Sequence, residues 1–182
     1  MSAPIQDINF RHKHTRRLVL LGVLTSLALV LHGVESWIAL PFAPAPGIKL
    51  GLANMVTVAA MDLVGPLSAL VVTTLRAALG PLLGGSVTGV AYAMAGALTS
   101  FAAMAALRAA GRGRFSRMGL SVAGAVCHHV GQLAVAAWVV GTASVFTYLP
   151  VMTLAAIPTG LAVGYGAGLI EKAAGRVYRR GV

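Results

Sequence analysis

Two basic side chains, Lys49 and Arg76, are the residues of this chain best suited to bind an anion. Each lies next to a segment rich in proline and glycine, residues 41–47 and 80–86, between strongly apolar stretches. Two cations that face one cavity attract an anionic or phosphorylated ligand, and a guanidinium can bind such a group with two parallel hydrogen bonds. The pattern predicts a small-molecule site. As alternatives, Lys49 could extend along apolar surface to water, and Arg76 could pair with Glu35.

Amide and imidazole side chains inside apolar stretches form a second group of candidates. Asn54 follows Lys49 by five residues, and its amide could bind a ligand or join neighbouring helices. His128 and Gln132 are four residues apart, so they share one face of a helix and could line a cavity or bond to another helix. His129 points about 100° away from His128, and no carboxylate accompanies them on this helix, which argues against a metal site. We therefore predict no metal, no cofactor, and a ligand site made of Lys49, Asn54, Arg76, His128 and Gln132.

The composition predicts that lipid surrounds the elements that position these residues. The chain has 182 residues, of which 58% are hydrophobic and 10% charged, whereas a soluble domain carries about 25% charged residues. Its 22 glycines suit closely packed membrane helices. We predict an all-α integral membrane protein, multi-pass, in a cell membrane of the bacterial cytoplasmic type.

Six membrane-spanning helices are expected from the apolar stretches. The second and third are short for a bilayer of about 30 Å, and short helices are tolerated where they line a cavity. The proline-rich loop before the second helix is expected to cover that cavity as a lid, through Pro44, Pro46 and Gly47. The predicted helices cover about residues 18–34, 48–61, 67–79, 87–107, 118–140 and 148–170.

The distribution of basic residues predicts the orientation in the membrane. The net charge is +10, but all of the 14 basic residues except Lys49 and Arg76 lie before the first helix, in residues 108–117 or after the last helix. An even number of spans puts these three clusters on one side, which the positive-inside rule assigns to the cytoplasm. The clusters thus indicate topology and not nucleic-acid binding. We predict a basic tail over residues 1–17, a membrane domain over 18–172 and a second basic tail over 173–182.

The first helix contains Gly22 and Ser26, a pair of small residues four apart that lets another helix approach closely. The partner could be another helix of this chain or a separate protein that docks there. The first apolar run is longer than the core of a signal peptide, so we expect it to be retained as a helix. The single cysteine, Cys127, lies in an apolar run and is expected to be a packed small residue.

Enzyme chemistry has little support in the residue types. The four acidic residues, Asp7, Glu35, Asp62 and Glu171, form no paired carboxylate motif, and nucleotide-binding loops and nucleophile elbows are missing from the sequence. Without a nucleotide-binding loop, any active transport needs ATPases supplied by other chains.

Several stretches together resemble one membrane family. They are residues 46–54 (PGIKLGLAN), 79–85 (LGPLLGG), 124–132 with its Gly-Ala, His128 and Gly-Gln pairs, and 148–150 (YLP). The chain resembles, over about residues 18–172, the family labelled heptaprenyl diphosphate synthase component I, also called the Gx transporter family. Where the family pattern has His-Asn, this chain has His128-His129.

The resemblance implies a fold and two functions. The family is similar to the S components of energy-coupling factor transporters, which have six helices, an outward pocket, a lid between the first two helices, and small residues on the first helix for docking. This implies a substrate-binding subunit that captures a small anionic vitamin-like or precursor molecule and works with a transmembrane coupling subunit and ATPases. The alternative is a non-catalytic membrane accessory protein in isoprenoid or quinone metabolism. A synthase activity is not expected, because prenyl diphosphate synthases bind magnesium through aspartate-rich clusters that this chain lacks.

Overall fold

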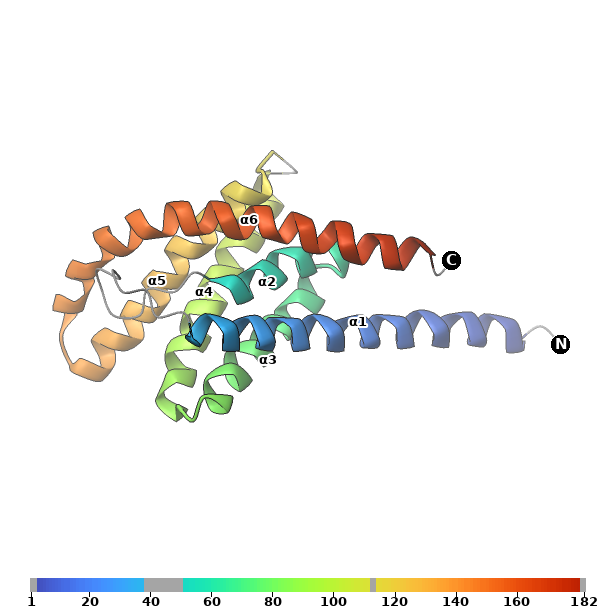
Figure 1. Ribbon diagram of the computed structural model, residues 1–182, viewed down its shortest axis with the longest axis horizontal. Coiled ribbons are helices and arrows are strands. Elements are labelled where there is room, and N and C mark those ends of the chain that lie inside the picture. The colour runs from blue at the N-terminus through green and yellow to red at the C-terminus, as the bar shows by residue number, and fades with distance from the viewer. Residues whose placement is uncertain (1–2, 38–50, 112–113, 181–182) are drawn as a thin grey trace.

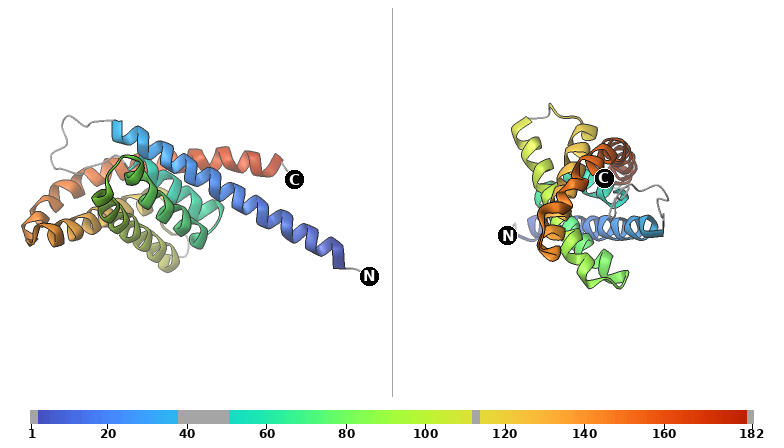
Figure 2. Two further views of the ribbon diagram at one scale, coloured as in Figure 1. Left: turned by 90° about the horizontal axis from the view of Figure 1, so that it is seen from below. Right: turned by 90° about the vertical axis from the view of Figure 1, so that its left-hand side faces the viewer.

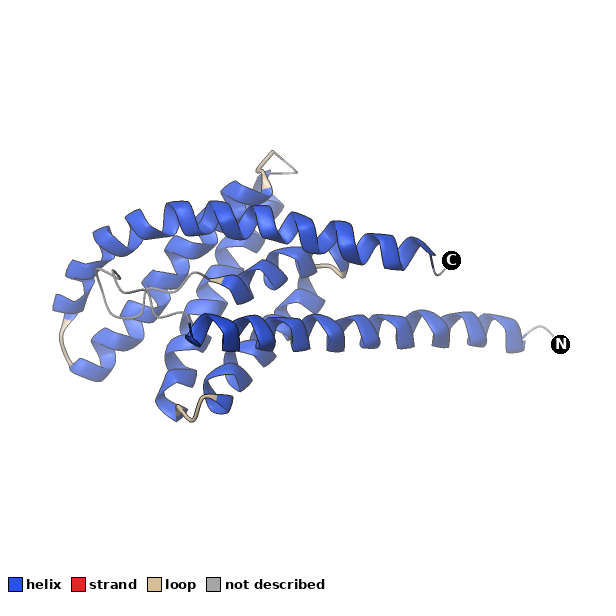
Figure 3. Ribbon diagram, viewed as in Figure 1, coloured by secondary structure: helices blue, strands red, loops and turns tan. Residues whose placement is uncertain are grey.

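The computed structural model describes residues 3–37, 51–111 and 114–180, with side chains described between residues 15 and 176. These ranges are helical apart from short turns and contain no strand (Figure 3). This confirms the predicted all-α fold. The helices are α1 (Ala3–Trp37), α2 (Leu52–Leu63), α3 (Pro66–Leu83), α4 (Val87–Gly111), α5 (Arg117–Val140) and α6 (Leu149–Arg180), with a 3₁₀ turn η1 (Ala143–Tyr148) before α6.

The six helices form a ring around a central space. Each helix packs against the next in the order α1, α3, α4, α5, α6, α2 and back to α1, and α2 also contacts α3. The start of α1 and the end of α6 lie at the same end of the bundle (Figures 1 and 2). We call this the basic end, and the opposite end, where α1 and α5 finish, the outer end.

Polar contacts tie the helices together at the basic end. The Arg17 guanidinium donates to the Ser68 hydroxyl, with Nε 3.1 Å from Oγ, so the start of the α1 span lies beside the start of α3. Arg108 forms an ion pair with Asp62, which joins α4 to α2. Arg117 and Glu171, 2.6 Å apart, join α5 to α6. The three basic clusters of the sequence therefore gather at one end, as predicted; which side of the membrane that end faces stays a prediction.

The outside of the bundle is apolar, as lipid contact requires. Long apolar side chains such as Val30, Leu154 and Tyr165 are more than 40% exposed, as are the indoles of Trp37 and Trp138 near the outer end. Among the described residues, five helices are long and apolar enough to cross a bilayer. The sixth, α2, has 12 residues and is about 18 Å long at 1.5 Å per residue, so it is the short helix that was predicted. The chain is a multi-pass membrane protein.

Four helix boundaries differ clearly from the prediction. The helices α1 and α6 continue into the stretches predicted as basic tails, because no proline or paired glycine interrupts residues 5–17 or 171–180. The helix α2 begins at Leu52 and not at residue 48, since Gly51 has a positive φ of 76°. The break predicted at residues 80–86 is wrong in its first half. Pro81 lies inside the last turn of α3, where its missing N–H removes one helical hydrogen bond without ending the helix, and the chain turns only at residues 84–86.

Glycines set the close spacing of α5 and α6. A Cβ atom at Gly160 would lie 2.7 Å from the Cα of Val122, and one at Gly164 would lie 2.6 Å from the Cα of Met118. These backbones touch directly, which is the small-residue packing typical of membrane helices. The contact holds the polar face of α5 against the centre of the ring.

Candidate functional site

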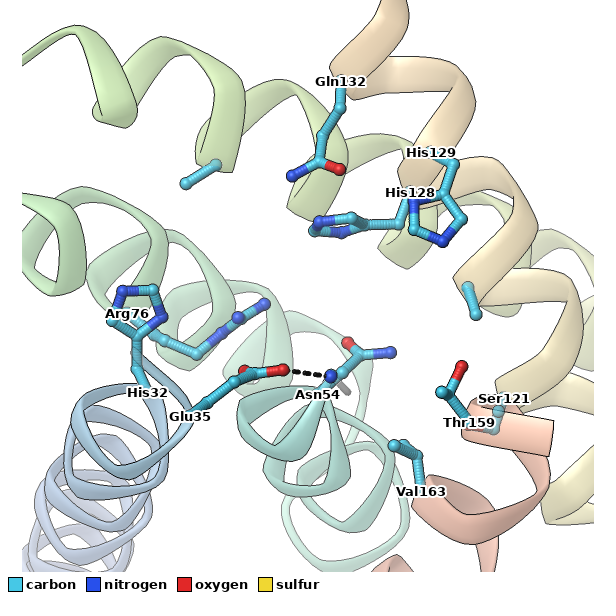
Figure 4. Close-up of a pocket in the computed structure, with 14 residues that line it drawn as sticks. His32, Glu35, Asn54, Arg76, Ser121, His128, His129, Gln132, Thr159 and Val163 are labelled. Carbon is cyan, nitrogen blue, oxygen red and sulfur yellow. Dashed lines mark hydrogen bonds between the residues drawn. The ribbon is translucent and has the colours of Figure 1, made fainter. Parts of the chain in front are cut away.

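A cavity of about 60 Å³ that contains polar and charged side chains lies at the centre of the ring, and all six helices contribute to it (Figure 4). Short helix α2 supplies Asn54 from its first turn, and α3 supplies Arg76. The helix α5 supplies a whole face, because positions 121, 125, 128 and 132 recur at helical spacing. We call this space the inner pocket. Its lining is His32, Glu35, Gly51, Asn54, Arg76, Ala93, Ser121, Ala125, His128, His129, Gln132, Thr159, Gly160 and Val163.

Arg76 is the cation of the inner pocket. Its side chain is only 7% exposed, and its Nε and one terminal nitrogen have no hydrogen-bond partner among the described residues. Glu35 supplies the opposite charge that acts on this guanidinium. A buried cation with unused donors is expensive unless an acceptor arrives. Arg76 therefore has donors that no described residue uses.

Glu35 has a structural bond of its own. The carboxylate is buried near the end of α1 and accepts a hydrogen bond from the backbone N–H of Gly51, the residue that caps the start of α2 (Figure 4). This contact ties α1 to the first turn of α2, which carries Asn54. Glu35 thus positions the pocket wall in addition to placing a negative charge near Arg76.

Four further polar atoms in the pocket lining are buried without a hydrogen-bond partner in the described part of the chain. They are Asn54 Oδ1, Ser121 Oγ, His129 Nδ1 and Gln132 Oε1. Buried polar groups in folded proteins are nearly always paired. Several unpaired groups around one cavity mark a place where a ligand or water supplies the missing bonds.

Glycines make room for two of the imidazoles. A Cβ at Gly96 would lie 2.7 Å from the His128 ring, and one at Gly80 would lie 2.7 Å from the ring of His32. The rings of His128 and His129 meet edge to face, with centroids 6.2 Å apart. The described residues contain no cluster of three or more His, Cys, Asp or Glu side chains that could hold a metal ion.

The structure brings together four of the five residues predicted to bind a ligand. Asn54, Arg76, His128 and Gln132 all line the inner pocket. The fifth, Lys49, and the predicted lid residues Pro44, Pro46 and Gly47 lie outside the described residues.

The predicted docking pair lies elsewhere, on the outer surface of α1. Gly22 and Ser26 are exposed, and a Cβ at Gly22 would meet no atom within 4 Å. Packing against another described helix of this chain is therefore excluded for Gly22. Docking of a separate protein stays a prediction.

Sequence reasoning left several lining residues out of the ligand site, chiefly His32, Glu35, Ser121, His129 and Thr159. His32 and Glu35 are three residues apart at the end of the first helix, and Ser121 is seven residues before His128, so helical spacing would have found these three. His129 was set aside because it points away from His128, yet its ring is 5% exposed and reaches the same cavity. Two adjacent residues on one helix can line the same cavity when the cavity lies between the directions of their side chains.

Comparison with known proteins gives one match. The family model described as "Heptaprenyl diphosphate synthase component I" matches residues 24–170, which include every described residue of the inner pocket. No curated protein and no solved structure matches the chain.

Proposed function

The chain belongs to the heptaprenyl diphosphate synthase component I family, a membrane family that resembles the S components of energy-coupling factor transporters, and from that premise we propose that it is a substrate-binding membrane subunit. Its inner pocket captures a small anionic molecule from the outer side. The chain itself performs no catalysis; other chains supply a transmembrane coupling subunit and ATPases.

The observation that carries this proposal is the state of Arg76. Arg76 is buried at the centre of the membrane domain, and two of its nitrogens have no partner in the described chain. A carboxylate or phosphate that binds there would supply the missing hydrogen-bond acceptors. Asn54 and Gln132 line the same pocket, and each amide carries an NH₂ donor as well as the oxygen that has no partner in the described chain. A hydrated channel would need polar groups along its whole length, whereas these groups converge on one space (Figure 4).

A non-catalytic role fits the acidic residues near the pocket. Glu35 is the acidic side chain in the described pocket lining, and its carboxylate already accepts the N–H of Gly51. The proposed role of this pocket is capture and release.

The family description itself favours a second candidate function. It names a component of a synthase, which supports a membrane accessory protein that binds an isoprenoid or quinone precursor for another enzyme. Both functions use the same pocket, and they differ in the partner and in whether the molecule crosses the membrane.

Native mass spectrometry of the detergent-purified chain tests the proposal. We expect the wild-type protein to carry a small anionic molecule, and Arg76→Gln to carry at least tenfold less. Ala134→Phe, an exposed position on α5 away from the pocket, is the matched control and should retain it. Equal loading of Arg76→Gln and wild type would overturn the proposal.

Uptake of the released molecule by cells separates the two functions. A transport subunit imports it only together with a coupling subunit and ATPases that hydrolyse ATP. An accessory protein shows no ATP-dependent uptake and instead co-purifies with a soluble synthase.

A further inference from the structure

A second cavity adjoins the inner pocket toward the outer end of the bundle. It has a volume of about 790 Å³ and lies between the ends of α1 and α3, the start of α4, and the outer halves of α5 and α6. His32, Ala93 and Gln132 line both spaces. We call this second space the outer compartment, and the shared residues make the two spaces neighbours that one molecule could occupy.

The sizes of the two spaces limit how a ligand can bind. The inner pocket, at about 60 Å³, holds roughly four water molecules, which is room for one carboxylate or phosphate group. Cavities that enclose whole cofactor-sized or drug-sized ligands measure about 300–1,000 Å³. The outer compartment falls in that range, so most of a ligand whose charged group reaches Arg76 must lie there.

The two linings differ in charge. The inner pocket contains Arg76, Glu35 and several unpaired polar atoms. The outer compartment has no charged side chain among its described lining residues. Its larger side chains are mostly apolar or aromatic: Leu29, Trp37, Leu83, Tyr92, Leu133 and Met152.

We infer that the ligand is an amphiphile, with one compact anionic head group bound by Arg76 in the inner pocket and an uncharged, largely apolar body in the outer compartment. This inference rests on the proposed function and adds the ligand class to it. Arg76 fixes the charge of the head group, and the outer compartment selects by the length and polarity of the body.

A series of simple amphiphiles tests the inference. Full-length protein in nanodiscs of zwitterionic lipid is titrated with n-alkyl phosphates and n-alkyl carboxylates from butyl to octyl. Inorganic phosphate and the matching alcohols are included, and empty nanodiscs correct for partition into lipid. Because burial of one methylene contributes about 0.8 kcal/mol, wild-type affinity should rise roughly three- to fourfold per added methylene in at least one anionic series.

Two variants assign this length dependence to the outer compartment. Ala136 lines it, so Ala136→Phe should flatten the dependence on chain length. Ala134→Phe, two residues away on the exposed face of α5, should keep the wild-type dependence. Arg76→Gln should weaken every anionic member at least tenfold and preserve the dependence on length.

The outcomes separate the inference from the function beneath it. Arg76-dependent binding of inorganic phosphate or of short carboxylates, without any gain in affinity from chain length, contradicts the inference that the ligand is an amphiphile. The proposed anion-binding function would still hold in that case. A length dependence that Ala136→Phe does not change also contradicts the inference, as does a lack of binding by all anionic members. Binding that Arg76→Gln leaves unchanged contradicts the proposed function as well.

Discussion

At the scale of single residues, Arg76 and Glu35 show how the inner pocket can contain two charges and still have donors of Arg76 without a partner in the described chain. Both are buried, but Glu35 has the Gly51 N–H as a partner, whereas two nitrogens of Arg76 have none in the described chain. A buried ion pair in which both groups were fully hydrogen-bonded would leave no free donor for a ligand. The unequal satisfaction of the two groups favours a binding role for Arg76.

Substitution of Glu35 separates its charge from its hydrogen bond. Glu35→Gln keeps an oxygen acceptor for Gly51 and removes the negative charge that competes for Arg76, so we expect near-wild-type stability and equal or tighter binding of an anion. Glu35→Ala leaves the Gly51 N–H unpaired and should reduce stability by about 1–3 kcal/mol. Thermal unfolding and titration of both variants measure this. Weaker anion binding by Glu35→Gln would show that the carboxylate contacts the ligand itself.

The sequence predicts residue types better than it predicts their partners. Asn54, Arg76, His128 and Gln132 stood out because polar groups are costly inside apolar helices, and all four line the pocket. Ser121 was missed since serine is common in membrane helices, and only its position on the inward face of α5 marks it. Which atoms remain unpaired depends on the packing of six helices, which no local pattern contains.

At the scale of elements, close helix packing and the short helix α2 together create the cavity. The length of α2 followed from the sequence, because breakers flank a short apolar run. The role of Gly160 and Gly164 did not, although they form a small pair four residues apart like Gly22 and Ser26. The internal pair on α6 packs against α5, while the pair on α1 faces outward. Spacing alone cannot tell such pairs apart, since it does not say which face is covered.

Gly164→Ala tests this packing. The added methyl would meet the backbone of Met118 at 2.6 Å, and a backbone cannot move aside as a side chain can, so we expect a loss of about 1–3 kcal/mol. The matched control is Gly175→Ala on the same helix, where a Cβ meets nothing within 4 Å. It should be neutral or slightly stabilising, because alanine favours helix over glycine by about 1 kcal/mol. Equal melting temperatures for the two variants would contradict the close contact of α5 and α6.

At the scale of the whole molecule, the even number of helices and the three clusters of basic residues were predictable from the sequence. The structure gathers these clusters at one end of the bundle, as an even number of helices requires. The sequence could not give the order of the helices around the ring. That order depends on which apolar faces fit together, and all six helices are apolar enough to exchange places in a pattern-based prediction.

Cysteine labelling tests the orientation. In a Cys127→Ser background, cysteine at Arg114, near the basic end, should resist a membrane-impermeant reagent added to intact cells. Cysteine at Ser144, in the turn at the outer end, should react, since both side chains are exposed. The positive-inside rule supplies the direction. Labelling of position 114 from outside would reverse the orientation and, with it, the side from which the pocket is loaded.

The outward face of α1 carries the prediction about a protein partner. Gly22→Leu and Ser26→Leu add bulk to an exposed surface, so they should leave the melting temperature unchanged but prevent close approach of a docking helix. Co-purification with a transmembrane coupling subunit and its ATPases should be lost, while Ala134→Leu on α5 retains it. Full retention by both α1 variants would place the docking surface elsewhere.

The central claim is that the inner pocket binds an anion through Arg76, and one titration tests it most directly. The small molecule released from wild-type protein is titrated calorimetrically into ligand-free wild type, Arg76→Lys and Arg76→Gln. A charge-assisted hydrogen bond contributes about 1.5–3 kcal/mol, so Arg76→Gln should bind roughly 10- to 150-fold more weakly, with no loss of thermal stability. Arg76→Lys should be intermediate, because an ammonium cannot make the two parallel bonds of a guanidinium. Wild-type affinity in Arg76→Gln, or a substantial fall in thermal stability shared by Arg76→Gln and Glu35→Gln, would show that Arg76 serves the fold and not a ligand.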